Sequence, residues 1–348
     1  MRSSRLAVLA VGLGISAGSF AAADAPGDWL IQMSNAARTS NYQGVLVYRG
    51  DELLETFRVT HRFADGAERE RVQSMTGEVR EVLKKMDAIT AILPKDRRMV
   101  FNRPTPKSLF PALSGKRLEQ IAAMYDVKDI GNSRIAGRMC RGITIAPRDA
   151  FRYGYELWAD RETAVPLKVT LVDKARRGIE QMFFTEVDFP STIPDEAFER
   201  DLPAESIRAS TNTAASAITT AQASEPLAEP VVAPMPGFSK LPPGFRVVRH
   251  EVRMLPDGSR EDHFVLSDGL SAISVFRAVR ITETDRTAQR LDQMGAVNAY
   301  SRLVGRMHVT VVGEAPQQTV KMIGDNYQAV SAEGGPVASP GAETPANP

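Results

Sequence analysis

Short β-forming segments follow one another from residue 41 to residue 188, and turn-forming residues separate them. The first two segments, 41–49 and 53–63, flank the polar turn Arg49-Gly50-Asp51-Glu52, which predicts an antiparallel hairpin. Further strands are predicted at 68–74, 78–84, 88–93, 99–102, 129–135, 138–147, 153–160, 167–173 and 179–188. Consecutive strands of this kind pair antiparallel. A series this long either closes into a barrel or curves around a filling, because a flat sheet would leave its edges exposed.

Two helical patterns accompany these strands. The first covers 26–39, where Pro26 suits the first turn and Trp29, Leu30, Met33 and Ala37 share one face. The second covers 116–126, with an apolar stripe of Leu118, Ile121, Ala122 and Tyr125. Two helices are too few to cover a flat sheet of this size, so we expect them to fill or cover a half-open barrel. The predicted fold class is α+β, mostly antiparallel β, with a helical plug or lid.

The N-terminus has the three parts of a secretory signal peptide. Arg2 and Arg5 form a basic start, residues 6–20 are apolar or small without charge, and Ala21-Ala22-Ala23 fits a cleavage site. The apolar part is shorter than the about 20 residues of a membrane span. We therefore predict that residues 1–23 are removed on export and that no later segment spans a membrane.

Composition divides the rest of the chain. Residues 24–205 form the predicted large domain, and residues 206–237 are rich in Ala, Ser, Thr and Pro, which is typical of a linker without a core. A smaller α+β domain is predicted at 238–330, with strands at 246–255, 260–267, 272–281, 296–303 and 307–312. A helix starting at Pro316 follows, with Val320, Ile323 and Tyr327 facing inward. Residues 331–348 have the composition of a disordered tail.

Charge and cysteine content exclude several classes of protein. The formal net charge of +1 becomes −1 when Arg2 and Arg5 leave with the signal peptide, so no general attraction to nucleic acid is expected. Cys140 is the only cysteine, which excludes an internal disulfide. We interpret it as a half-buried strand residue.

The sequence offers no convincing catalytic or metal site. The four histidines, at 61, 250, 263 and 308, stand apart, and no zinc-binding, serine-hydrolase or phosphate-loop motif is present. A hydrolase acting on envelope lipids would need a nucleophile–base pair that the sequence does not provide. We therefore predict a protein without cofactor or metal, and not an enzyme.

Two groups of residues indicate binding instead. Aromatic side chains on predicted strands and helices would line or border a ligand cavity, and those selected are Trp29, Tyr48, Phe57, Phe101, Tyr153 and Trp158. Basic clusters would attract an acidic peptide or lipid phosphates at the mouth of that cavity, and those selected are Arg69, Arg71, Arg97 and Arg98.

Six stretches in a fixed order carry a resemblance to a known family. The large domain contains RIAGRMC (134–140), RYGYELW (152–158) and TAVPLK (163–168), and the small domain contains LPPGF (241–245), DGLSAISV (268–275) and VGEAP (312–316). No single stretch is diagnostic, but the ordered set resembles the RseB/MucB family of periplasmic regulators of the sigma-E envelope-stress pathway. The resemblance covers residues 24–330.

The resemblance implies a non-enzymatic role in the periplasm. Family members bind the periplasmic domain of a membrane anti-sigma factor (RseA or MucA) and shield it from the first protease of a cleavage cascade. Their large domain is similar to the lipoprotein carrier LolA, and lipid or lipopolysaccharide in its concavity is the implied release signal. The chain would then sit at the inner membrane only through its partner.

Two points stay open. A periplasmic lipid or lipoprotein carrier would use the same concavity for transport, although such a carrier would need only the first domain. The sequence does not fix the oligomeric state, a homodimer included.

Overall fold

The computed structural model describes residues 25–50, 53–76, 81–85, 88–93, 97–101, 113–199, 237–254, 258–279 and 289–328. The predicted signal peptide and tail, and all of the predicted linker except residue 237, lie outside these residues. For β4 to β6 the backbone alone is described, so Arg97, Arg98 and Phe101 are placed on β6 without their side chains.

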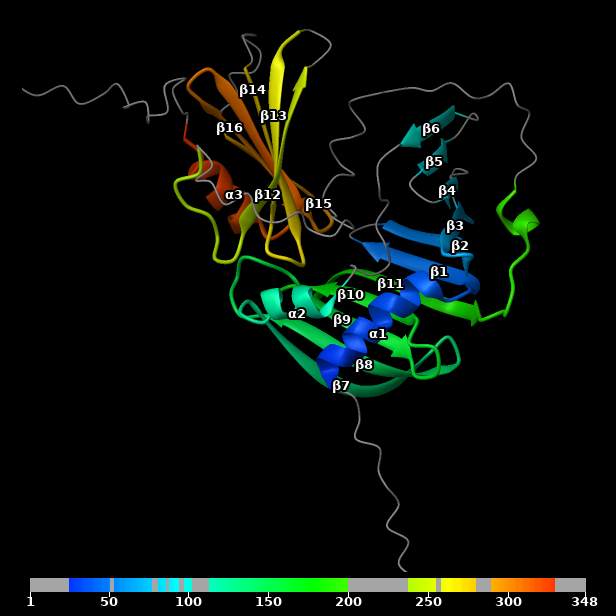
Figure 1. The fold of residues 1–348 in the computed structure, drawn as a ribbon. Coiled ribbons are helices and arrows are strands. Elements are labelled where there is room, and N and C mark those ends of the chain that lie inside the picture. Colours follow the sequence, from blue (N-terminus) through cyan, green and yellow to red (C-terminus); the bar gives the residue numbers. More distant parts are fainter. Residues whose placement is uncertain are drawn as a thin grey trace, which may run out of the picture.

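The large domain is built on one antiparallel sheet, in the strand order β6-β5-β4-β3-β2-β1-β11-β10-β9-β8-β7. Its strands are β1 (Tyr42–Gly50), β2 (Leu53–Ala64), β3 (Ala67–Ser74), β4 (Glu81–Lys85), β5 (Ala88–Leu93), β6 (Arg97–Phe101), β7 (Tyr125–Ile135), β8 (Arg138–Pro147), β9 (Gly154–Asp160), β10 (Pro166–Val172) and β11 (Gly178–Asp188). The sheet curves around α1 without closing (Figure 1). The predicted half-open barrel and hairpin are confirmed.

Helix α1 (Pro26–Thr39) occupies the concave side of this sheet. Its apolar face buries Trp29, Leu30 and Met33 in one core with inner-face residues such as Leu46 and Leu157. Burial of each such side chain contributes about 1.5–3 kcal/mol. The helix has the bounds and the buried face that the sequence predicts, because the apolar spacing follows the helical period.

The second helix is shorter than expected. α2 (Gly115–Ile121) begins after Ser114, whose side chain accepts a hydrogen bond from the backbone N–H of Arg117 and so caps the helix. Residues 122–124 form a turn, and Tyr125 already belongs to β7. The prediction of a helix to residue 126 was therefore wrong, because the apolar stripe continues through the turn into a buried strand residue.

The small domain is a second antiparallel sheet, in the order β12-β13-β14-β17-β16-β15. Its elements are β12 (Arg246–Met254), β13 (Arg260–Ser267), β14 (Ala272–Val279), β15 (Arg290–Met294), β16 (Val297–Val304), β17 (Met307–Glu314) and α3 (Gln317–Asp325). Val320, Ile323 and Tyr327 are fully buried against one face of this sheet, as predicted. The sequence pattern did not predict the polar edge strand β15.

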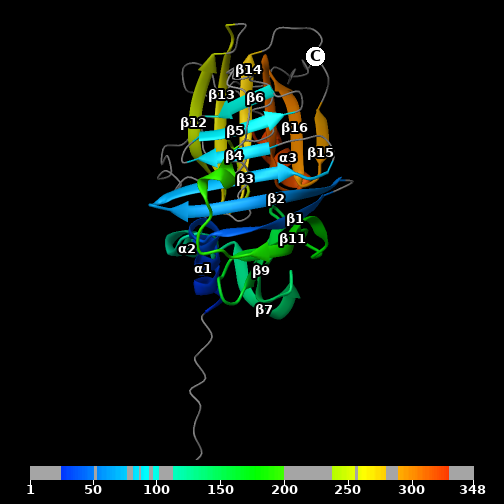
Figure 2. The same ribbon diagram turned by 90° about the vertical axis from the view of Figure 1, so that its right-hand side faces the viewer.

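The small domain stands on the end of the large domain that carries α2 and the β9–β10 region (Figure 1). The strands β3 to β6 rise on the same side as the small domain and cross in front of it in the rotated view (Figure 2). A short strap with a 3-10 helix, η1 (Asp195–Phe198), follows β11. Arg62 and Arg69 both contact Asp195 at 2.5 Å and stack on the ring of Phe198, which fixes the strap to β2 and β3.

Candidate functional site: the junction between the domains

Two loops of the small domain dock on the large domain. The first precedes β12 and contains Gly244, and the second joins β13 to β14 and contains Gly269. Gly244 has a φ of +78° and lies against the Met124 side chain, and Gly269 has a φ of +102° and lies against Ile121. A Cβ atom would stand 2.9 Å from Met124 and 3.0 Å from Ile121. Both glycines therefore allow a left-handed backbone and a close approach of the domains.

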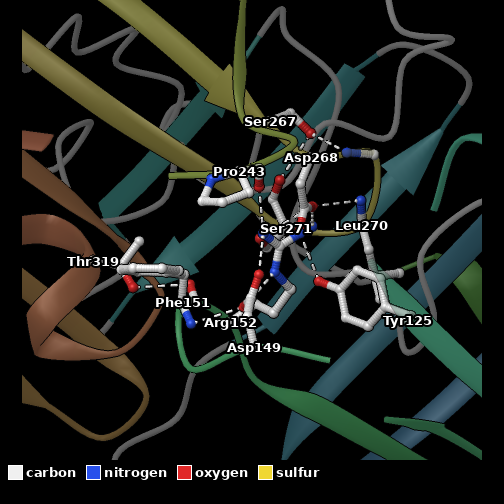
Figure 3. Close-up of polar contacts among 11 residues, drawn as sticks. Tyr125, Asp149, Phe151, Arg152, Pro243, Ser267, Asp268, Leu270, Ser271 and Thr319 are labelled. Atoms are coloured by element: carbon white, nitrogen blue, oxygen red, sulfur yellow. Dashed lines mark hydrogen bonds and ion pairs between the residues drawn. The ribbon is translucent and has the colours of Figure 1, made fainter. Parts of the chain in front are cut away.

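Arg152 is the central side chain of this junction (Figure 3), and it is 0% exposed. Its Nη1 donates to Asp268 Oδ2 of the small domain at 2.8 Å, and its Nη2 donates to the Pro243 carbonyl oxygen at 2.5 Å. Within the large domain, Nε donates to Asp149 Oδ1 and Nη2 lies by Asp149 Oδ2, both at 3.0 Å. Each nitrogen of the guanidinium thus has an acceptor, as a buried charge requires.

The two carboxylate oxygens of Asp268 accept hydrogen bonds from different domains. Oδ1 accepts hydrogen bonds from the backbone N–H groups of Leu270 and Ser271, at 2.9 and 2.8 Å, and so holds the loop in shape. Oδ2 faces the large domain, where it accepts from Arg152 and from the Tyr125 hydroxyl, both at 2.8 Å (Figure 3). Asp268 therefore orders its own loop and also fixes that loop to the large domain.

A second set of contacts lies beside the first. Asn298 donates to the Tyr153 hydroxyl at 3.1 Å, the Thr319 hydroxyl donates to the Phe151 carbonyl at 2.8 Å, and Glu180 accepts from the backbone N–H of Ala296 at 2.9 Å. Tyr153 and Ala296 also share a small apolar cluster. The two domains are thus joined by polar contacts around a few apolar residues.

The junction is built for binding contacts and not for proton transfer. Burial, with the nearby Asp268 carboxylate, raises the pKa of Tyr125 well above its usual value, so its hydroxyl stays protonated and donates. Burial likewise raises the pKa of Tyr153. Neither group could serve as a base near neutral pH.

One buried pair in the small domain has the distance of a serine–histidine dyad. Nε2 of His263 lies 3.0 Å from the Ser274 hydroxyl, but the guanidinium of Arg253 lies 3.1 Å from Nδ1. Because arginine only donates, Nδ1 must accept, so the proton of neutral His263 is on Nε2 and points at Ser274. The imidazole therefore cannot take a proton from that hydroxyl. Within the described residues, no group of three or more His, Cys, Asp and Glu could hold a metal ion.

The aromatic residues selected from the sequence are not gathered in one place. Tyr48 and Phe57 share the inner face of the sheet with Leu46 on β1 and β2. Trp29 is buried on α1 with Arg141 of β8 over its ring, nearer the other end of the sheet. Tyr153 lies in the domain junction. Trp158 alternates with the buried Leu157 and stacks on Gly142, so it lies on the outer face. No observation tests whether these residues, or Phe101 on β6, contact a ligand, so that contact stays a prediction for all six.

The four arginines predicted from the sequence also do not form one group. Arg69 binds Asp195, and Arg71 donates to the Ala197 carbonyl at 3.0 Å, so both hold the strap of their own chain. The side chains of Arg97 and Arg98 lie outside the described residues. Contact of these four arginines with a partner or a lipid phosphate stays a prediction.

The concave side leaves little space in this arrangement. The hollow at the inner face has a cavity volume of about 0 Å³, and it is lined by Leu46, Pro166, Leu167, Lys168, Val169, Met182 and Phe184. Ligand pockets commonly have about 300–1,000 Å³. The apolar side chains of α1 pack in the same core as these inner-face residues.

Both domains match models of known protein families. Residues 25–202 match the model of the MucB/RseB N-terminal domain, and residues 237–328 match that of the MucB/RseB C-terminal domain. The chain belongs to the MucB/RseB family. The resemblance drawn from the six stretches is confirmed. In the part of the chain that the structure describes, no helix is long and apolar enough to cross a membrane.

Named relatives match over nearly the whole chain. The sigma factor AlgU regulatory protein MucB of Pseudomonas aeruginosa is 29% identical, over 87% of this chain and 90% of that protein. The sigma-E factor regulatory protein RseB of Escherichia coli K12 is 27% identical, over 88% and 92%. The crystal structure of MucB in complex with MucA(peri) has a TM-score of 0.65 at 25% identity, over 88% of this chain and 100% of that one. The crystal structure of MucB alone has a TM-score of 0.55 at 25% identity, over 86% and 96%.

Three of the six sequence stretches that resemble the family contribute residues to the junction. Arg152 and Tyr153 open RYGYELW, Pro243 and Gly244 belong to LPPGF, and Asp268 opens DGLSAISV. Neither Arg152 nor Asp268 is among the site residues predicted from the sequence. Their only signal was the position of each next to turn residues in these stretches.

Proposed function

We propose that this protein is a periplasmic negative regulator of a sigma-E-type envelope-stress response. It binds the periplasmic domain of a membrane anti-sigma factor of the RseA/MucA kind and shields it from the first protease of the cleavage cascade. The observation that carries the proposal is the match of both domains to one regulatory family, together with the shape shared with MucB in its complex with MucA(peri).

The architecture supports a binding role. Both domains are antiparallel sheets with one face covered by a helix, and a specific polar junction joins them. A carrier that only moved lipid would not need the small domain or this junction. In this proposal the regulator acts without cofactor or catalysis. A measurement of its mass in solution distinguishes a monomer from a homodimer.

Lipid or lipopolysaccharide is the proposed release signal. Its acyl chains would bind on the concave side of the large sheet, against Tyr48 and Phe57, in the space that the apolar face of α1 fills here. Lipid and anti-sigma factor then need only prefer different arrangements of the protein. A coupling free energy of about 1–3 kcal/mol changes the affinity for the partner about 5- to 150-fold.

Protease protection tests the proposal. The mature protein is mixed with the periplasmic domain of the anti-sigma factor and its site-1 protease, with and without lipopolysaccharide. We expect the regulator to slow cleavage and lipopolysaccharide to restore it. Cleavage at an unchanged rate, with no complex in gel filtration, would reject the proposal and direct attention to lipoprotein transfer between membranes.

Alanine at Tyr48 and Phe57 tests the lipid site separately. We expect this double variant to protect the anti-sigma factor as before but to respond less to lipopolysaccharide. Trp158→Ala is the matched control, because Trp158 is an aromatic residue on the outer face of the same sheet. An equal response in both variants would remove the inner face as the lipid site.

A further inference from the structure

Three of the side chains that join the domains, those of Arg152, Asp268 and Asn298, also have a partner in their own domain. Arg152 binds Asp149 of the large domain through Nε and Nη2, independently of the small domain. Asp268 keeps the backbone N–H groups of Leu270 and Ser271. Asn298 keeps the Ala315 carbonyl, to which it donates at 2.8 Å.

This duplication changes what separation of the domains would cost. Breaking a buried ion pair is normally expensive because it leaves one charge buried without a partner. Here separation would expose Arg152 still paired with Asp149, and Asp268 still bonded to its own loop. Arg152 and Asp268 therefore have partners in both the joined and the separated arrangement. Two arrangements without an unpaired charge allow the junction to switch between them.

We propose that the Arg152–Asp268 junction is a reversible latch, and that the surface that binds the anti-sigma factor is composite, complete only while the latch joins the two domains. The second part rests on the proposed function. An ionic contact suits this task, because a buried charge pair fixes one orientation without adding much net stability. Large, mainly apolar interfaces are instead typical of parts that stay together permanently.

Two solved MucB structures match the shape of this chain to different degrees. The chain matches MucB in complex with MucA(peri) better than MucB alone, at the same identity and nearly the same coverage.

Asp268→Asn is the variant that tests the latch. The amide oxygen of asparagine still accepts from the N–H groups of Leu270 and Ser271, so the loop keeps its shape. The amide NH₂ group replaces Oδ2 and faces the donating guanidinium of Arg152, which removes the contact between the domains. Asp129→Asn is the matched control, because Asp129 also accepts from a backbone N–H, that of Gly131, and from an arginine, Arg141, but within one domain.

Small-angle X-ray scattering of the full mature chain and its affinity for the anti-sigma factor's periplasmic domain are the two measurements. We expect Asp268→Asn to increase the radius of gyration and to weaken binding about tenfold, which corresponds to about 1.4 kcal/mol. Asp129→Asn should change neither. Circular dichroism shows that each variant is folded, and Arg152→Gln, which removes the other charge, should act like Asp268→Asn.

The outcomes separate the two ideas. An unchanged radius of gyration in both Asp268→Asn and Arg152→Gln would overturn the latch. An increased radius with unchanged affinity would overturn the composite surface and leave the proposed function intact. If the wild-type protein fails to bind the anti-sigma factor at all, the proposed function fails, and the scattering data alone still decide the latch.

Discussion

Gly269→Ala should separate the domains without changing any charge. Gly269 has a φ of +102°, and a Cβ atom there would lie 3.0 Å from Ile121 Cγ2 of the large domain. Alanine in a left-handed backbone costs about 1–2 kcal/mol. Overpacking against Ile121 adds about 1–3 kcal/mol, but only while the domains stay joined. The second cost therefore drives the domains apart and leaves each one folded.

Gly131→Ala is the control for the backbone cost. Gly131 has a φ of +87°, and no atom lies within 4 Å of the position of its Cβ. The variant should lose about 1–2 kcal/mol of large-domain stability and keep the wild-type radius of gyration. Both tryptophans, Trp29 and Trp158, are in the large domain, so their fluorescence follows urea unfolding of that domain alone. Gly269→Ala should leave this fluorescence transition nearly unchanged and increase the radius of gyration.

A second substitution tests whether the methyl group is responsible. Ile121→Leu removes the branched methyl that the new Cβ would meet, at nearly constant volume, and such changes cost less than about 1.5 kcal/mol. Added to Gly269→Ala, it should restore the compact radius of gyration. If Gly269→Ala stays compact, or if Ile121→Leu fails to restore it, the contact does not control the junction.

Three further predictions concern the large domain. Cys140 is 0% exposed, and burial raises the pKa of its thiol to about 11, so a thiol reagent at neutral pH should react only at the rate of unfolding, and fast labelling of the native protein would contradict this. Burial alone would raise the pKa of Asp160, but hydrogen bonds from Arg138 and Thr163 lower it. The stability that these bonds give is present above the unfolded pKa of about 3.9 and is lost as the pH falls through the folded value. In Asp160→Asn the urea midpoint should therefore depend less on pH below about pH 4, and its dependence on pH above about pH 5 should match that of the wild type. Phe198→Leu, which removes the ring under two arginines, should cost about 0.5–1 kcal/mol per lost stacking contact in urea unfolding, whereas Phe198→Tyr should not.

Local sequence patterns predicted the helices and strands more accurately than the tertiary contacts between them. The bounds of α1, β8 and β13 follow directly from apolar periodicity and turn residues. β15 was missed because it is a polar edge strand, four of whose residues, 290–293, are exposed, and such a strand has no apolar face to give it a pattern. α2 was extended too far because a buried strand residue, Tyr125, continued the helical stripe by chance.

The junction could not be derived from spacing. Arg152 and Asp268 are 116 residues apart, and each stands where an exposed arginine or a turn-forming aspartate would be ordinary. Their burial results from the docking of two loops, which no periodicity encodes. The resemblance to a family contained this information only indirectly, since three of the stretches that carry it contribute side chains or backbone to the junction.

The filled concave side limits which lipids could act as the release signal that we propose. A ligand that takes the place of Trp29, Leu30 and Met33 must replace about 5–9 kcal/mol of apolar burial, at about 1.5–3 kcal/mol for each side chain. A buried methylene contributes about 0.8 kcal/mol, so an acyl chain needs about 6–11 buried methylenes to compete. We therefore expect lipids with long acyl chains to relieve protease protection and analogues shortened to about four carbons to fail at any soluble concentration. The comparison is a chain-length series with one constant headgroup. Equal action of short and long chains would show that the headgroup alone carries the signal, and that α1 stays in place when the regulator releases its partner.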